Sequence, residues 1–123
     1  MQIYESAENY LKTILQLQQR KEHVHSVDVA EELGFSKASV SIAMKKLREN
    51  GYISMDRDGT LHLLEPGMEV AQRIDERHRI ITALLVSLGV DEYTALKDAC
   101  RIEHDLTEET FDKIKSFVTE NLM

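Results

Sequence analysis

The sequence predicts a mostly α-helical protein of two parts with one small β-hairpin, and three observations support this prediction. Apolar residues recur at intervals of three or four over most of the chain, as they do in amphipathic helices. Strand-like patterning is confined to residues 52–64. Charge also divides the chain, because residues 1–64 hold 8 Lys and Arg against 9 Asp and Glu, whereas residues 65–123 hold 7 against 13. The acidity of the second half leaves the first half free to offer a local basic surface.

Three helices are predicted in the first fifty residues. Residues 5–19 carry apolar side chains at helical spacing. Ser26 is a good N-cap for a short helix that continues through Leu33. Ser36 can cap a third helix, which we expect to run to about Asn50.

The remaining elements are a hairpin and three further helices. Residues 52–55 and 60–64 are predicted to be strands joined by the turn between them. A long helix then runs from Pro66, which suits a first helical turn, to about residue 88. Asp91 can cap a fifth helix through residue 104, and Thr107 a sixth.

The composition describes a folded protein of the cytoplasm. Hydrophobic residues make up 42% and charged residues 30% of the chain, so disorder is not expected. The apolar runs are too short to cross a membrane, and the N-terminus has no basic and apolar leader. Cys100 is the only cysteine, which excludes a disulfide framework and fits a reducing compartment. We therefore expect a cytoplasmic location and no membrane partner.

Helix, turn, helix and hairpin in this order form the layout of a winged helix-turn-helix. The small Ala30 lets the two helices approach closely, and Gly34 permits the tight bend between them. Val29 and Val40 are placed to pack in the angle. The second helix of such a pair enters the major groove of double-stranded DNA, so its N-terminal residues face base edges.

The candidate DNA contacts are small or basic side chains on that helix and at the hairpin tip. Short hydroxyl side chains can reach phosphates or base edges, Ala38 can meet a thymine methyl group, and basic side chains suit phosphates. An alternative is a protein-interaction module whose basic face is merely solvated. The DNA-binding candidates are Ser36, Lys37, Ala38, Ser39, Ser41, Ile42, Lys45, Lys46 and Arg57.

A second candidate site is a metal site near the end of the fifth predicted helix. Cys100, Glu103 and His104 are spaced at i, i+3 and i+4, so on a helix they project from one face. A thiolate, a carboxylate and an imidazole are ligands for a divalent transition metal. The alternative is a buried cysteine beside two exposed polar residues.

Four segments together resemble the diphtheria toxin repressor and manganese transport regulator family of metal-dependent bacterial repressors. The resemblance covers nearly the whole chain. The segments are ENYLKTI (8–14), VAEELGFS (29–36), RHR (77–79) and DACRIEH (98–104).

The resemblance implies a ligand set for the metal. Cys100, Glu103 and His104 match primary-site ligands, and His78 matches a histidine that binds metal in both the iron type and the manganese type. Asn9 stands at a further ligand position and offers a side-chain oxygen.

Three residues of this chain depart from the family pattern at positions that bear on the number of metal ions. Lys12 replaces a carboxylate of the manganese type, and Thr82 and Leu96 replace second-site ligands of the iron type. The SH3-like third domain of the iron type is also missing. The resemblance thus implies an iron-type primary site on a short, manganese-type frame.

We therefore expect a homodimeric, metal-activated repressor of iron or manganese homeostasis genes. Residues 1–65 would form the winged helix-turn-helix DNA-binding domain, and residues 66–123 a helical metal-binding and dimerisation domain. The expected cofactor is Fe²⁺ or Mn²⁺, with Zn²⁺ or Co²⁺ able to bind in vitro. The expected partners are double-stranded operator DNA and a second copy of the chain, with no small organic substrate.

Three alternatives remain open at this point. One is a winged-helix regulator that responds to an organic effector, or to redox change at Cys100. Another is a hydrolytic zinc site. We expect no enzyme, because the sequence offers no separate general base, Gly-rich anion loop or nucleophile motif. The third is a dimerisation module that does not bind DNA.

Overall fold

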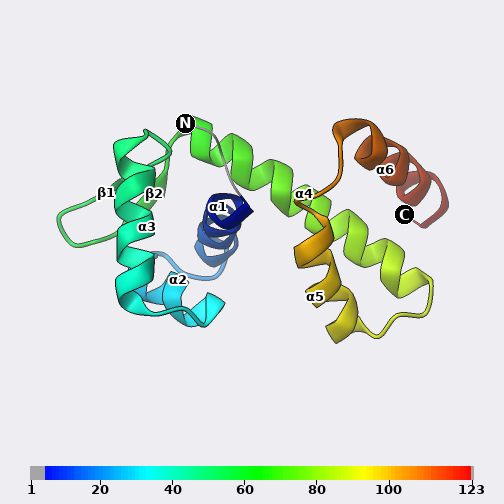
Figure 1. Cartoon of the computed structure of the whole chain (residues 1–123), viewed down its shortest axis with the longest axis horizontal. Coiled ribbons are helices and arrows are strands. Elements are labelled where there is room, and N and C mark those ends of the chain that lie inside the picture. The colour runs from blue at the N-terminus through cyan, green and yellow to red at the C-terminus, as the bar shows by residue number, and fades with distance from the viewer. Residues whose placement is uncertain (1–4, 123) are drawn as a thin grey trace. The chain divides into compact units, whose positions relative to one another are not determined.

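The computed structural model of the chain describes residues 5–122, which contain six helices and one two-stranded sheet (Figure 1). This confirms the predicted class, a mostly helical protein with one hairpin. The elements in chain order are α1 (Glu5–Gln18), α2 (Ser26–Leu33), α3 (Lys37–Glu49), β1 (Ile53–Met55), β2 (Leu61–Leu63), α4 (Glu65–Ser87), α5 (Glu92–Ile102) and α6 (Glu108–Leu122).

The chain folds into two compact units. The first ends at Arg73 and the second begins at Ile74, so α4 contributes to both. We predicted the domain boundary between residues 65 and 66, which is at the start of α4 and before the division between the two units. The predicted division into two domains stays a prediction. None of the helices in residues 5–122 is long and apolar enough to cross a membrane.

The first unit is built around a core to which α1, α2, α3 and the hairpin all contribute. The strands are antiparallel, with Ile53 opposite Leu63 and Met55 opposite Leu61. The segment between α1 and α2 also joins the hairpin, because the Leu61 N–H donates to the Val24 carbonyl over 2.8 Å. The fully enclosed core residues include Leu11, Ile14, Val24, Val29, Val40, Met44, Leu47, Ile53 and Leu61.

The bend between α2 and α3 has the structure that the sequence predicts. Gly34 adopts φ +71°, a left-handed conformation that favours glycine, and it ends α2. Val29 and Val40 are fully buried on the two sides of this bend, and Ala30 is nearly so. The helix pair therefore owes its angle to one glycine and its packing to small and β-branched side chains.

Most predicted helix starts are confirmed, but the start of α2 is not. Ser36 caps α3 by accepting the Ser39 N–H over 3.1 Å, and Asp91 caps α5. The N-cap of α2 is His25, whereas we predicted Ser26. The reason is Asp28, whose carboxylate accepts the His25 N–H over 2.8 Å. This hydrogen bond makes His25 the N-cap, one residue before the predicted position.

The second unit consists of the C-terminal part of α4 together with α5 and α6, which both lie beside it (Figure 1). Ile80 of α4 packs against Phe111 and Val118 of α6. Ala95 and Ala99 of α5 are completely buried, which lets α5 lie close to its neighbours. This unit holds the candidate metal ligands of α4 and α5.

Candidate metal centre

Three of the predicted metal ligands lie together in the second unit. His78, Cys100 and Glu103 each offer one ligand atom within 4.8 Å of the other two. His78 Nδ1 lies 2.9 Å from Glu103 Oε2 and 3.8 Å from Cys100 Sγ. Residues 5–122 contain no other group of three such side chains at this spacing. A histidine, a thiol and a carboxylate thus converge from two helices.

The helices place these side chains for local reasons. Cys100 and Glu103 are three residues apart at the end of α5, so they share one face. His78 lies on α4 and reaches that face from the opposite side. Glu103 is fully buried, and the side chain of His78 is only 13% exposed. The candidate site therefore lies between α4 and α5, where its side chains are largely shielded from solvent.

His104 adjoins the cluster through Glu103. Its Nε2 atom lies 3.3 Å from Glu103 Oε1, and its side chain is 1% exposed. The carboxylate of Glu103 consequently has one imidazole at each oxygen, His78 at Oε2 and His104 at Oε1.

The helix that carries these residues is shorter than predicted. α5 ends at Ile102, so Glu103 is its C-cap and His104 belongs to the following turn. The prediction that the fifth helix extends through residue 104 was therefore wrong, whereas the face that His104 shares with Cys100 stays a prediction. His104 stays a predicted ligand because it is buried beside Glu103.

The fifth predicted ligand, Asn9, lies in the other unit. It is half-buried on α1, three residues before the buried Lys12, so these two share one face of the helix. The role of Asn9 as a ligand stays a prediction.

The donor set fits a divalent transition metal. Buried carboxylates are stable as anions only when positive charge or hydrogen-bond donors compensate them. Thiolate, imidazole and carboxylate together suit ions of intermediate softness, such as Fe²⁺, Co²⁺ or Zn²⁺, and the carboxylate also suits Mn²⁺. The cluster can thus hold one divalent ion with the chemistry that the sequence predicts.

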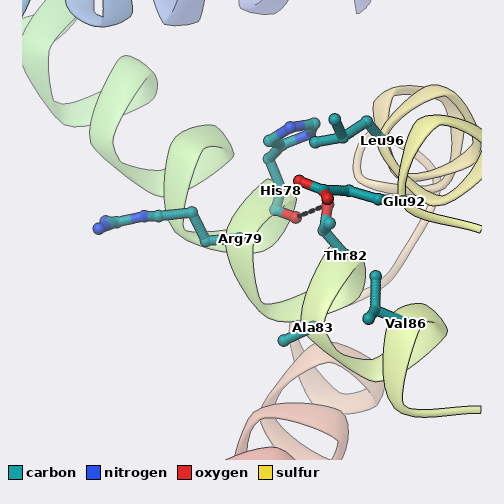
Figure 2. Close-up of a pocket in the computed structure, with 7 residues that line it drawn as sticks. All are labelled: His78, Arg79, Thr82, Ala83, Val86, Glu92 and Leu96. Carbon is teal, nitrogen blue, oxygen red and sulfur yellow. Dashed lines mark hydrogen bonds between the residues drawn. The ribbon is translucent and has the colours of Figure 1, made fainter.

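A pocket of about 350 Å³ lies beside His78, between α4 and α5 (Figure 2). Leu96 and Glu92 of α5 extend toward His78 and Thr82, while Arg79 points away. Thr82 donates its hydroxyl to the His78 carbonyl over 2.7 Å. Thr82 and Leu96, which the resemblance matches to second-site ligand positions, line this pocket and carry no charge, whereas Glu92 brings a carboxylate to it.

Sequence reasoning missed the structural part played by Arg77. The side chain is only 5% exposed and hydrogen-bonds the main chain of Glu103. The one signal in the sequence was its place directly before His78, within the segment 77–79 that carries the family resemblance. Nothing in that position identified its partners, which lie more than 25 residues further along the chain.

All nine predicted DNA contacts lie on the surface of the first unit. The helix α3 buries Val40, Met44 and Leu47 and turns the candidates outward. Ile42 is 60% exposed although it is apolar. Arg57 lies in the turn between β1 and β2. The exposed candidates are Ser36, Lys37, Ala38, Ser39, Ser41, Ile42, Lys45, Lys46 and Arg57.

Two family models match the chain, one for each half. Residues 2–61 match the model described as iron dependent repressor, N-terminal DNA binding domain. Residues 64–121 match the model described as iron dependent repressor, metal binding and dimerisation domain.

Similar sequences come from both archaea and bacteria. An uncharacterized HTH-type transcriptional regulator of Methanocaldococcus jannaschii is 33% identical over 116 residues, which are 93% of each chain. The transcriptional regulator MntR of Escherichia coli O157:H7 is 32% identical over 117 residues, covering 95% of this chain and 76% of the relative. MntR of Bacillus subtilis strain 168 is 30% identical, covering 92% and 80%.

Solved structures share the fold. A manganese-dependent transcriptional repressor in complex with manganese superposes with a TM-score of 0.84 at 27% identity, covering 92% of this chain. IdeR of T. acidophilum superposes with a TM-score of 0.82 at 25% identity, covering 97%. This chain spans about half the length of those two proteins, 52% and 55% respectively.

Proposed function

Because this chain belongs to the iron-dependent repressor family, whose two domain models match residues 2–61 and 64–121, we propose that it is a metal-activated transcriptional repressor. Family members bind metal and DNA and are regulators rather than enzymes. The observation that carries the proposal is the convergence of His78, Cys100 and Glu103 in the domain described as metal-binding.

The proposed ligands are His78, Cys100, Glu103 and His104, with Asn9 as a further one. When bound, a divalent ion would place positive charge beside the buried Glu103 carboxylate. Cys100 must lose its proton to act as a ligand, so metal affinity should fall at low pH. His78 and His104 must be neutral, which low pH also opposes.

We further propose that the ion is Fe²⁺ in preference to Mn²⁺. The thiol of Cys100 lies within 3.8 Å of the His78 imidazole, and soft thiolates favour iron, cobalt or zinc over manganese. One solved structure with this fold is a manganese-dependent repressor, whereas both matching family models are described as iron dependent, so the relationships do not decide between the two ions.

The proposed partners are double-stranded operator DNA and a second copy of this chain. The exposed face of α3 supports the first, because its basic side chains Lys37, Lys45 and Lys46 are all turned to solvent. The family description of residues 64–121 as a dimerisation domain supports the second. The regulated genes are proposed to be those of iron or manganese homeostasis.

The experiment that tests this function is an anaerobic DNA-binding titration with Fe²⁺, Mn²⁺, Co²⁺ and Zn²⁺ on the DNA upstream of its own gene. Metal should increase the affinity of the wild type, whereas Glu103→Gln should abolish the increase while the protein stays folded. The matched control is Glu109→Gln, which alters an exposed carboxylate in the first turn of α6. An unchanged metal response of Glu103→Gln would contradict the assignment of the site.

Metal content after gentle purification separates this function from the organic-effector alternative. A repressor of the proposed kind should retain stoichiometric metal that a chelator removes. A protein whose DNA binding ignores chelation would instead support regulation by an organic effector.

A further inference from the structure

Arg77 is almost completely buried in the second unit, with 5% of its side chain exposed. Arginine is seldom buried unless it is paired, and both terminal nitrogens of this guanidinium have partners, whereas the buried Nε has none among residues 5–122. Its Nη1 atom donates to the main-chain carbonyls of Glu103 over 3.1 Å and of Leu106 over 2.7 Å. Nη2 pairs with the Glu108 carboxylate over 2.9 Å, and the guanidinium lies 5.1 Å from the centre of the Phe111 ring.

These contacts meet α5 where it ends. The last carbonyls of a helix lack partners within the helix and carry the negative end of its dipole. Glu103 is the C-cap of α5, and its carbonyl receives a donor from Arg77 on α4. The guanidinium therefore fastens the last turn of α5 to α4 and compensates that turn's partial negative charge.

Two consecutive residues of α4 consequently contact Glu103, one at its main-chain carbonyl and the other at its side-chain carboxylate. Its carbonyl oxygen accepts from Arg77, and its Oε2 atom lies 2.9 Å from His78 Nδ1. Cys100 lies one turn earlier on the same helix. A shift of the end of α5 would thus move Cys100 and Glu103 together relative to His78.

We propose that Arg77 is a positioning residue for the metal centre. It fixes the end of α5 so that the Cys100 thiol and the Glu103 carboxylate face the His78 imidazole. This inference rests on the proposed metal site and adds a residue outside the ligand set.

The position suits arginine in particular. Its planar guanidinium offers donors in fixed directions, so one side chain serves two carbonyls and a carboxylate at once. The Glu108 carboxylate is 67% exposed, so this ion pair contributes little by itself. The bonds to the carbonyls of Glu103 and Leu106 therefore carry the positioning.

Cobalt titration followed by absorption tests the inference, because a thiolate ligand to Co²⁺ gives a charge-transfer band and the d–d bands report geometry. Wild type, Arg77→Met and Arg77→Lys would be titrated with Co²⁺ without oxygen. Altered surroundings of metal ligands typically weaken affinity by about 10- to 100-fold. We expect that loss and a changed spectrum in Arg77→Met, and an intermediate loss in Arg77→Lys, which keeps the charge.

The matched control is Lys115→Met. Lys115 of α6 pairs with Glu76 of α4 over 3.2 Å, so it also joins α6 to α4, but both side chains are about half exposed. It lies outside the contacts of Glu103, so cobalt affinity and spectrum should stay those of the wild type. Circular dichroism and the unfolding midpoint of each variant would be measured beside the titration.

Three outcomes would overturn the inference. The first is wild-type cobalt affinity and spectrum in Arg77→Met with only a lower unfolding midpoint, since Arg77 would then serve stability alone. The second applies if Arg77→Met does not fold: wild-type cobalt affinity and spectrum in Arg77→Lys would then show that Arg77 serves stability alone. The third is a wild type that shows no thiolate band with Co²⁺, which would also contradict the proposed metal centre.

Discussion

Glu103 is the most enclosed member of the candidate metal centre, and its surroundings explain why a divalent ion suits the site. The carboxylate is shielded from water, with His78 at one oxygen and His104 at the other. A buried anion requires compensating positive charge. Imidazoles provide that charge only when protonated. A divalent ion bound between these side chains would add positive charge beside the carboxylate, with neutral imidazoles as ligands.

Cys100 should set the metal preference. Replacing its thiol by a carboxylate in Cys100→Glu removes the soft ligand, and oxygen ligands favour Mn²⁺. We expect wild type to bind its DNA at a lower concentration of Fe²⁺ or Co²⁺ than of Mn²⁺, and the variant to shift toward Mn²⁺. Anaerobic titrations of DNA binding with each ion measure this.

Thr94→Glu is the control for an added carboxylate on α5, because Thr94 is exposed and lies outside the cluster. Its metal preference should match that of the wild type. A wild type that responds to Mn²⁺ at least as readily as to Fe²⁺ would refute the argument from ligand softness.

Among the elements, α3 offers the clearest test of DNA binding. Lys45→Ala and Lys46→Ala each remove an exposed charge, so binding to any DNA sequence should weaken. The dependence on salt concentration should fall by about one unit of slope for each lost phosphate contact. Substitutions at Ala38 or Ser39 should instead change the preference between operators. Fluorescence anisotropy at several salt concentrations measures both effects.

Lys113→Ala is the matched control for these variants, since it removes an exposed lysine from α6. It should leave the affinity for random DNA and its salt dependence unchanged. Equal binding of random DNA by wild type and both α3 variants would contradict the proposed orientation of α3.

The start of α2 depends on the carboxylate of Asp28. Burial alone raises the pKa of Asp28, but hydrogen bonds from Lys21 and from the His25 N–H outweigh this effect and hold the pKa below the ordinary value of an aspartate. A carboxyl group with a lowered pKa stabilises the fold above its unfolded pKa. That stabilisation is lost as the pH falls through the folded value, because protonation weakens both hydrogen bonds.

Asp28→Asn should therefore destabilise the metal-free protein by about 1 kcal/mol near neutral pH, as the loss of a helix cap does. The difference from wild type should begin to shrink as the pH falls below the unfolded aspartate pKa of about 3.9, and should vanish once the pH passes the lowered pKa of folded Asp28. Urea unfolding at pH 7 and pH 3 in the presence of a chelator measures the free energy of unfolding. A deficit of the same size at both pH values would show that the carboxylate charge is not responsible.

For the whole molecule, metal binding should raise stability through linkage. An ion that binds only the folded state stabilises it by about 2.7 kcal/mol when its free concentration is 100 times the dissociation constant. The wild type should gain this amount with saturating Co²⁺, and Glu103→Gln should gain far less. Denaturant unfolding with and without the ion measures the gain. Equal gains in both proteins would place the binding elsewhere.

Local patterns in the sequence determined the elements of the molecule. Apolar spacing predicted α1, capping residues and Pro66 predicted the later helices, and a change of period predicted the hairpin. Gly34 predicted the bend between α2 and α3, where its positive φ is observed. The candidate DNA contacts on α3 could be identified because exposure alternates with burial along one helix. Such features depend on neighbours within a few residues, so one sequence is enough to predict them.

Only the tertiary structure decided how the side chains of the candidate metal centre come together. The three-residue spacing of Cys100 and Glu103 was evident, but His78 lies 25 residues before Glu103 and was inferred from resemblance alone. The end of α5 at Ile102 and the contacts of Arg77 could not be predicted from spacing. The physical reason is that both follow from the packing of α4 against α5. This packing is set by the shape and burial of side chains along two helices, and no short segment of the sequence contains it.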